Sequence, residues 1–337
     1  MYLLNNSNKM FFIFILFFSS LISISSNSWF GCWIGLEINL LSFIPLISSP
    51  FNLLSSEASL KYFLTQSIAS INFLFVILLK MIFMKNFFMD NFISIIINSS
   101  LLMKMGSAPF HFWFPNIVEG LSWFNNFILM TWQKITPMIL LSYYFNKNFL
   151  YLMIIFNIMI GSIEGLNQTS LRKLMAFSSI NNLGWMIFSI MISENLWIFY
   201  FIMYSFLISI MCFFFFNLNM FFINQLFINN INPLIKINLL INFLSLGGLP
   251  PFLGFLPKWI MINFLIINKL YLLTFLFIMS SLIIIFFYIR IMYSCFMFNY
   301  FKMKWLKIYL KNNVLWIMNF FSMISISGMI LSTFLFF

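Results

Sequence analysis

The sequence predicts an all-α protein that crosses a membrane many times. Its 337 residues are 63% hydrophobic and only 7% charged, so the chain has too few polar side chains to cover a water-soluble core. The apolar residues form continuous runs that can cross about 30 Å of hydrocarbon as helices. Strands of a membrane barrel would instead alternate apolar and polar residues, and the sequence does not show that pattern.

About eleven runs have the length of a transmembrane helix, at roughly 20 residues each. The first run is interpreted as a retained span and not as a signal peptide, because residues 19–28 contain no A-x-A site and another apolar run follows. We expect one integral membrane domain over residues 1–337. The expected spans cover residues 8–26, 28–48, 57–84, 92–107, 121–145, 147–166, 172–192, 195–222, 235–267, 270–293 and 314–336.

Basic residues predict the orientation of these spans. The net charge of +11 comes mainly from lysines and arginines at the ends of apolar runs, so we expect no nucleic-acid partner. Residues 301–313 are interpreted as a basic loop that lies at the lipid headgroups or in solvent. The side of the N-terminus carries Lys9, Arg172, Lys173, Lys236, Arg290, Lys302, Lys304, Lys307 and Lys311, whereas the other carries Lys80, Lys85, Lys147 and Lys269. The N-terminus is therefore expected on the positive side, the cytoplasm or the mitochondrial matrix.

The residue types also exclude several kinds of site. Cys32, Cys212 and Cys295 are too widely spaced for a metal knuckle and are expected to be buried apolar residues. The sequence contains no dinucleotide fingerprint, C-x-x-C, H-E-x-x-H or P-loop, so any cofactor is expected on other chains. The 51 Phe and 25 Met residues suit AT-rich codons, which indicates an organelle genome.

One local repeat predicts two broken helices. The stretch GSAPFHFWFP from Gly106 aligns with GLPPFLGFLP from Gly248, and the two stretches lie five spans apart. Proline interrupts a helix, and the freed backbone groups survive in a membrane only inside protein or against water. Because five is odd, the second unit is inverted relative to the first, as in transporters. The approximate repeat units are 8–145 and 147–293, followed by the helix 314–336.

Four ionisable residues lie inside these apolar runs, namely Glu37, Lys104, Lys134 and Lys258. A charge at the bilayer centre costs at least about 2.5 kcal/mol, so each of the four suggests a function. Burial destabilises the charged form of a lysine, whereas a nearby carboxylate stabilises it, and the approach of Glu37 to Lys104 would therefore control a proton. The alternatives are lysines that extend to the interface and a structural ion pair at Glu37.

Two further features have simpler interpretations. Glu57 and Lys61 have i, i+4 spacing and are expected to form an ion pair at a helix end. His111, the single histidine, is expected at the membrane interface, with a place on a proton path as the alternative.

Six motifs in order resemble one known family. They are GLEINLLSFIPL, EASLKYFLTQ, KMGSAPFHFWFP, TWQKITP, LNQTSLRKLMAFSSINNLGWM and GGLPPFLGFLPKW, from about Ser28 to Trp259. They resemble the antiporter-like membrane-arm subunits of NADH:ubiquinone oxidoreductase, respiratory complex I. The resemblance places the family's functional glutamate on Glu37 and its lysines on Lys104, Lys134 and Lys258. Asn182 departs from the family, because many relatives carry a titratable histidine there.

The resemblance implies a proton-translocating subunit in the mitochondrial inner membrane. The distribution of basic residues then predicts the N-terminus in the matrix, and the odd number of spans predicts the C-terminus in the intermembrane space. NADH, FMN, iron–sulfur clusters and ubiquinone would bind to partner subunits and not to this chain. The expected partners are other membrane-arm subunits, including other antiporter-like subunits, and phospholipids. Two other hypotheses stay open: an independent cation/proton antiporter, and a scaffold between pump subunits whose lysines are structural.

Overall fold

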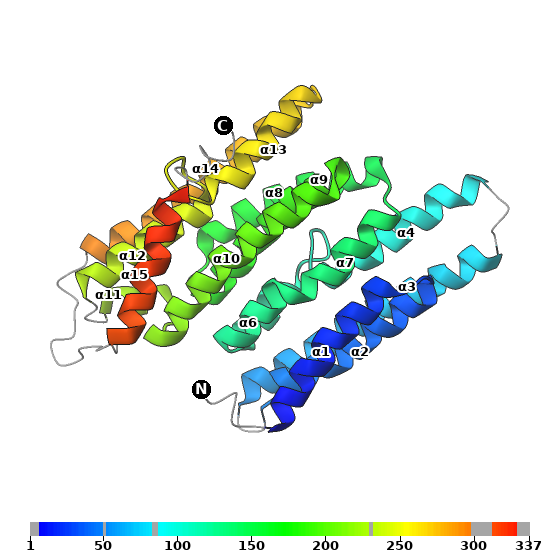
Figure 1. Cartoon of the computed structure of the whole chain (residues 1–337), viewed down its shortest axis with the longest axis horizontal. Coiled ribbons are helices and arrows are strands. Elements are labelled where there is room, and N and C mark those ends of the chain that lie inside the picture. The colour runs from blue at the N-terminus through cyan, green and yellow to red at the C-terminus, as the bar shows by residue number, and fades with distance from the viewer. Residues whose placement is uncertain (1–6, 50–51, 83–86, 229–231, 298–311, 329–337) are drawn as a thin grey trace. The chain divides into compact units, whose positions relative to one another are not determined.

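The computed structural model describes residues 7–49, 52–82, 87–228, 232–297 and 312–328. The described residues form helices and no strand, which confirms the all-α prediction (Figure 1). Seven of the helices among them are long and apolar enough to cross a membrane. The predicted count of about eleven spans is not reached by these alone: the predicted spans 121–145 and 235–267 are each divided into two shorter helices. The basic segment 301–311 and the end of the last predicted span lie outside the described residues.

The chain divides into two compact units, Met1–Met153 and Ile154–Phe337, with the boundary inside one helix. The first unit contains α1 (Ser7–Ser25), α2 (Trp29–Ile47), α3 (Leu53–Ile82), α4 (Phe87–Met105), α5 (Trp113–Gly120), α6 (Trp123–Met130), α7 (Trp132–Tyr143) and the start of α8 (Lys147–Ile163). The second unit contains the rest of α8, the 3₁₀ helix η1 (Glu164–Asn167), α9 (Leu171–Ile192), α10 (Glu194–Leu218), α11 (Ile223–Ile228), α12 (Pro233–Gly247), α13 (Phe255–Ile267), α14 (Tyr271–Met297) and α15 (Asn312–Ile326).

Each unit has its own core of large apolar side chains. In the first unit, Phe43 of α2 and Phe73 of α3 are completely buried, and Phe43 packs edge-on against Tyr62. In the second unit, α9 is buried on nearly all its sides, and its Trp185 ring packs against Phe277 of α14. A helix that is apolar and buried all round belongs in the interior of a bundle. The polar residues of α9 therefore face other protein groups.

The two predicted helix breaks are present and have the same backbone geometry. α4 is followed directly by Gly106, with φ of 72°, and α12 directly by Gly248, with φ of 82°. After each glycine the next residue donates its backbone N–H to the carbonyl five residues earlier, from Ser107 to Leu102 at 3.1 Å and from Leu249 to Leu244 at 3.3 Å. This is the glycine-ended helix cap that satisfies free carbonyls, and glycine is favoured because φ is positive.

The segment predicted as a continuous helix over 121–145 differs in the structure. It is divided at Thr131 into α6 and α7. The Thr131 hydroxyl donates to the Phe127 carbonyl at 2.7 Å, and such back-bonding bends helices. Pro137 lies six residues after Thr131, in α7. It has no N–H to donate to the Gln133 carbonyl, and its ring clashes with that carbonyl. Both features loosen the turn that carries Lys134.

Candidate proton-transfer site

The first unit places Lys104 and Glu37 close to each other. Lys104 is buried in the last turn of α4, directly before the break. Glu37, half-buried on α2, lies close enough for its charge to act on the Lys104 ammonium. Among the described residues no hydrogen bond or ion pair joins these two side chains directly. Gln66 of α3 fixes the end of α4 by donating its side-chain amide to the Lys104 carbonyl at 3.1 Å. The Lys104 backbone is therefore fixed, while its ammonium has no direct bond to the Glu37 carboxylate.

A small cavity adjoins Lys104. The space open to the centre of a water-sized sphere in this cavity is about 10 Å³. This volume is close to the minimum that holds one water molecule. The side chain of Gln133 on its wall donates to Asn39 Oδ1 at 2.8 Å, and this bond joins α7 to α2. The buried hydroxyl of Thr136, also on the wall, has no hydrogen-bond partner among the described residues. The lining residues are Leu36, Asn39, Leu40, Tyr62, Gln66, Lys104, Gln133, Thr136 and Pro137. The cavity can thus offer polar contacts to a water beside Lys104.

Lys134 is the most deeply buried of the predicted site residues, with 1% of its surface exposed. It lies in the first turn of α7, next to Gln133 on the wall of the Lys104 cavity. Its Nζ lies 5.3 Å from the centre of the Phe114 ring of α5. A cation over an aromatic face is stabilised without giving up its proton to a partner. The second half of the first broken helix, α5, therefore supplies the surface on which this ammonium rests.

In the second unit Lys258 reaches back to the end of α12. The side chain starts on α13, and its Nζ donates to the Gly247 carbonyl at 2.7 Å. It also lies 6.0 Å from the centre of the Trp185 ring. The carbonyl end of a helix carries partial negative charge, which favours an ammonium there. Gly248 makes room, because a Cβ at that position would lie 2.8 Å from Lys258 Cδ and 2.9 Å from Nζ.

The cavity beside Lys258 has the same size as the one beside Lys104, about 10 Å³ for the centre of a water-sized sphere. Asn182 of α9 is one of its walls, and its Oδ1 accepts a hydrogen bond from the Tyr200 hydroxyl at 3.1 Å. The position at which the sequence departs from the family therefore faces the same space as Lys258. The lining residues are Asn182, Tyr200, Tyr204, Leu207, Leu246, Gly254, Pro257 and Lys258.

The two units thus place a lysine at the same kind of position by different means. Lys104 precedes its break and belongs to the last turn of the helix that ends there. Lys258 follows its break, and its side chain returns to the end of the preceding helix. Both ammonium groups are buried and both adjoin a cavity of about one water molecule. In the sequence the two lysines lie on opposite sides of the motif, whereas in each unit the lysine lies at the end of the helix that precedes the break.

Three other predicted residues have clear positions. Lys61 and Glu57 form the expected ion pair at 2.6 Å, and both side chains are exposed. His111 is not at an exposed position, because only 2% of its surface is accessible; it lies in the break after α4, with its ring beside Phe112. The three cysteines are buried and free, as expected.

Sequence reasoning missed one buried lysine. Lys236 was counted among the charges on the N-terminal side, at the start of the expected span 235–267, but it is only 3% exposed in α12, and its Nζ donates to the Cys295 carbonyl at 2.8 Å. Cys295 lies near the end of α14, so this ammonium binds to the carbonyl end of a helix. The signal was present, since Asn232 and Pro233 have the N-cap and N1 pattern that starts a helix before Lys236.

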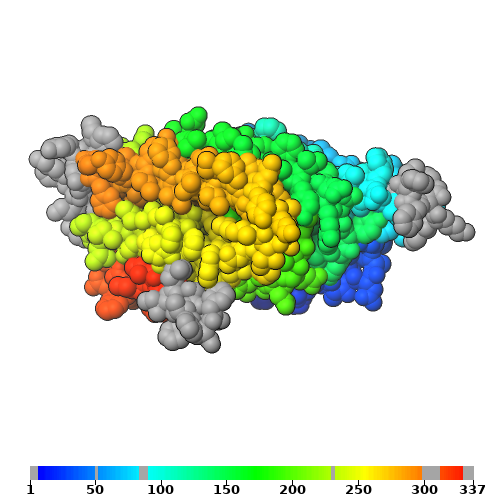
Figure 2. Space-filling model, turned by 90° about the horizontal axis from the view of Figure 1, so that it is seen from above, coloured from blue at the N-terminus to red at the C-terminus, as the bar shows by residue number. Residues whose placement is uncertain are grey.

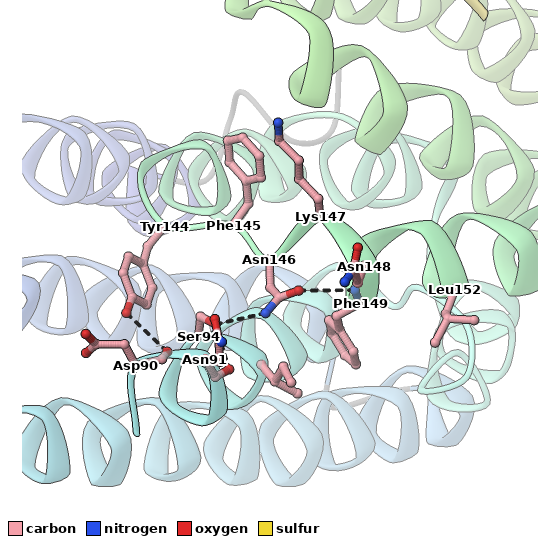
Figure 3. Close-up of a pocket in the computed structure, with 11 residues that line it drawn as sticks. Asp90, Asn91, Ser94, Tyr144, Phe145, Asn146, Lys147, Asn148, Phe149 and Leu152 are labelled. Atoms are coloured by element: carbon pink, nitrogen blue, oxygen red, sulfur yellow. Dashed lines mark hydrogen bonds between the residues drawn. The ribbon is translucent and has the colours of Figure 1, made fainter. Parts of the chain in front are cut away.

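A much wider hollow lies at the other end of α4 from Lys104 (Figure 3). Its volume is about 600 Å³, and it is open to the surface. The Tyr144 hydroxyl donates to the Asp90 carbonyl, and the Asn146 side chain donates to Ser94 and accepts from the Phe149 N–H (Figure 3). None of the four predicted site residues lines this hollow. Among the described residues there is also no group of three or more His, Cys, Asp or Glu side chains that could hold a metal ion.

Comparisons of the sequence and of the fold with known proteins show similarity to one family. The sequence profile of the family described as "NADH:quinone oxidoreductase/Mrp antiporter, TM" matches residues 26–284. NADH-ubiquinone oxidoreductase chain 2 of Anopheles gambiae is 53% identical and covers 96% of both chains, and that of Aedes aegypti is 51% identical and covers 97% of both. Among solved structures, a chain of respiratory complex I from Thermus thermophilus with bound aureothin has the same fold, with a TM-score of 0.78 at 20% identity over 86% of this chain and 71% of that one.

Proposed function

We propose, from the premise that the chain belongs to the family of NADH:quinone oxidoreductase and Mrp antiporter membrane subunits, that it translocates protons as an antiporter-like subunit in the membrane arm of respiratory complex I. The chain contributes to NADH:ubiquinone oxidoreduction as part of the complex. NADH, FMN, the iron–sulfur clusters and ubiquinone bind to other subunits. The complex resides in the mitochondrial inner membrane, with the N-terminus of this chain in the matrix and the C-terminus in the intermembrane space.

Glu37, Lys104, Lys134 and Lys258 are the proposed proton carriers. The observation that carries this proposal is that three lysines are almost completely buried, although an uncompensated charge inside a membrane is costly. Lys258 donates to a backbone carbonyl, and Lys134 lies over an aromatic ring. A lysine with such surroundings can lose and regain a proton without breaking a buried ion pair.

The proposed switch in the first unit is the distance between Glu37 and Lys104. When the carboxylate approaches, the Lys104 ammonium is stabilised and retains its proton; when the carboxylate withdraws, the ammonium releases its proton. The water-sized cavity beside Lys104 offers the first acceptor, and Gln133 on its wall leads to the neighbouring Lys134. Quinone chemistry on other subunits would drive the movement of Glu37 through contacts with neighbouring membrane-arm subunits.

Replacing Lys134 with methionine tests the proposal. Methionine keeps most of the apolar length of the side chain but cannot hold a proton. In the assembled complex we expect fewer protons pumped per electron, with NADH oxidation retained when the membrane is uncoupled. Lys61→Met is the matched control, because Lys61 is an exposed lysine of the same unit and should leave the ratio unchanged.

Other outcomes separate the competing functions. An unchanged ratio in the Lys134→Met complex would contradict the proposed role of this residue. Loss of assembly, with a normal ratio in the complexes that still form, would indicate a scaffold. Cation/proton exchange by the purified chain alone in liposomes would indicate an independent antiporter. The proposed function requires instead that pumping depends on electron transfer in the complete complex.

A further inference from the structure

A row of buried polar side chains runs along the contact between α12 and α15, in the second unit. Figure 2 shows α12 between α14 and α15. On α12 the polar positions have the spacing i, i+4, i+7, so they share one face of the helix. Asn238 donates its amide to Asn319 Oδ1 at 2.6 Å and accepts from the Ser322 hydroxyl at 3.2 Å. The row, here called the α12–α15 seam, consists of the buried Asn238, Asn242, Ser245, Ser322 and Ser325 and the half-buried Asn319.

Polar side chains between membrane helices often serve only to hold the helices together. That role requires each polar group to have a protein partner, and one group in the seam has none. The Asn242 amide donates to the Asn238 carbonyl at 2.9 Å, but its Oδ1 has no hydrogen-bond partner among the described residues. Asn242 is 1% exposed. A buried carbonyl oxygen without a protein donor is a typical site for an internal water molecule.

The seam leads to the cavity beside Lys258. At its inner end the backbone carbonyl of Ser325 accepts a hydrogen bond from the Leu253 N–H at 2.9 Å, which joins α15 to the break between α12 and α13. Gly254 lines the Lys258 cavity, and a Cβ at this position would collide with the Ser245 carbonyl. From Asn238 to Ser245 the helix rises about 10 Å, at 1.5 Å per residue. The polar row therefore covers about half the length of α12, on the side of the break.

The opposite face of α12 offers no comparable route. Toward α14, the Phe243 ring packs against Tyr288 with ring centres 5.1 Å apart, and a Cβ on Gly247 would lie 2.9 Å from Ile285. Lys236 on that side binds the Cys295 carbonyl near the end of α14. This face is closely packed between Lys236 and the break, where the aromatic rings of Phe243 and Tyr288 fill it. Lys236 is therefore interpreted as a structural cap of α14.

We propose that the α12–α15 seam holds a row of water molecules that carries protons between Lys258 and the aqueous side on which α12 begins. The inference rests on the proposed function, because it gives Lys258 its connection to water. In one transfer an N–H bond of the Lys258 ammonium breaks, the amine becomes neutral, and one proton appears at the outer end of the row. The reverse transfer restores the ammonium. Asn242 is a positioning residue, since its amide holds a water molecule and does not itself titrate.

The test is Asn242→Leu in the complete complex, with protons pumped per electron and NADH:ubiquinone activity as readouts. Leucine has nearly the same volume but binds no water, so the ratio should fall while uncoupled electron transfer is retained. Asn242→Ser keeps a polar group and leaves space for water, so it should pump more than Asn242→Leu. Asn217→Leu is the matched control: its amide makes the same bond to the carbonyl four residues earlier, but on α10, outside the seam.

An unchanged ratio in assembled Asn242→Leu complexes would overturn the inference. If this variant does not assemble, a high-resolution map of the unmodified complex decides instead: ordered water within hydrogen-bond distance of Asn242 Oδ1 supports the seam, and a dry contact between α12 and α15 overturns it. The two proposals can fail separately. Normal pumping by Asn242→Leu together with reduced pumping by Lys134→Met would remove the seam and leave the proposed function in place.

Discussion

Replacing Gly248 with alanine should displace Lys258 from the end of α12. Gly248 has a φ of 82°, and an added Cβ would lie 2.8 to 3.1 Å from three side-chain atoms of Lys258, including Nζ. The backbone at this position also donates to the carbonyls of Leu244 and Ser245 at 3.0 Å, which fixes the end of the helix. The flexible lysine side chain will move before the backbone does. The bond from Nζ to the Gly247 carbonyl, 2.7 Å long, is then lost.

The size of the effect follows from two terms. An alanine in the left-handed region costs about 1–2 kcal/mol relative to glycine. A hydrogen bond that involves a charged group contributes about 1.5–3 kcal/mol, and its carbonyl acceptor stays buried after the bond is lost. Together these terms predict a loss of about 2.5–5 kcal/mol at the break. The first term affects the stability of the backbone, whereas the second changes the position and proton affinity of Lys258.

The measurement is the number of protons pumped per electron by membranes that contain the assembled variant complex. We expect the Gly248→Ala complex to pump fewer protons per electron than the unmodified one. The control is the double variant with Lys258→Met, in which the alanine can no longer displace an ammonium and should not lower the ratio beyond Lys258→Met alone. Normal pumping by Gly248→Ala, or a further decrease in the double variant, would refute the reasoning.

Two other predictions concern residues of opposite kinds. Asn182→Leu removes the acceptor of the Tyr200 hydroxyl from the wall of the Lys258 cavity, so proton pumping per electron should fall at normal electron transfer; an unaltered ratio would show that this amide is not needed. Glu57→Gln breaks only the exposed ion pair with Lys61, so the thermal stability of the complex should change by less than about 1 kcal/mol, and a large shift in a thermal melt would contradict this.

The existence and type of the helices could be predicted from the sequence because continuous apolar runs in a lipid environment have few alternatives to a helix. The two breaks could also be predicted, since glycine and proline have the same effect in almost any context. The division at Thr131 was not predicted. A threonine in a helix bends it only when its hydroxyl binds the preceding turn, and the sequence does not show which rotamer the side chain adopts.

The sequence by itself determined which residues carry charge into the membrane: Glu37, Lys104, Lys134 and Lys258 stand out because their neighbours along the chain are apolar. Only the tertiary structure decided what each charge meets. Lys258 folds back onto the helix before its break, Lys134 lies over the Phe114 ring, and Lys236, expected at the aqueous end of a span, is buried against the end of α14. The physical reason is that burial and hydrogen-bond partners come from segments far apart in the chain. The free-energy cost of a charged residue inside a membrane can be predicted from its apolar neighbours in the sequence. The groups that offset this cost come from whichever helix the fold brings beside the residue.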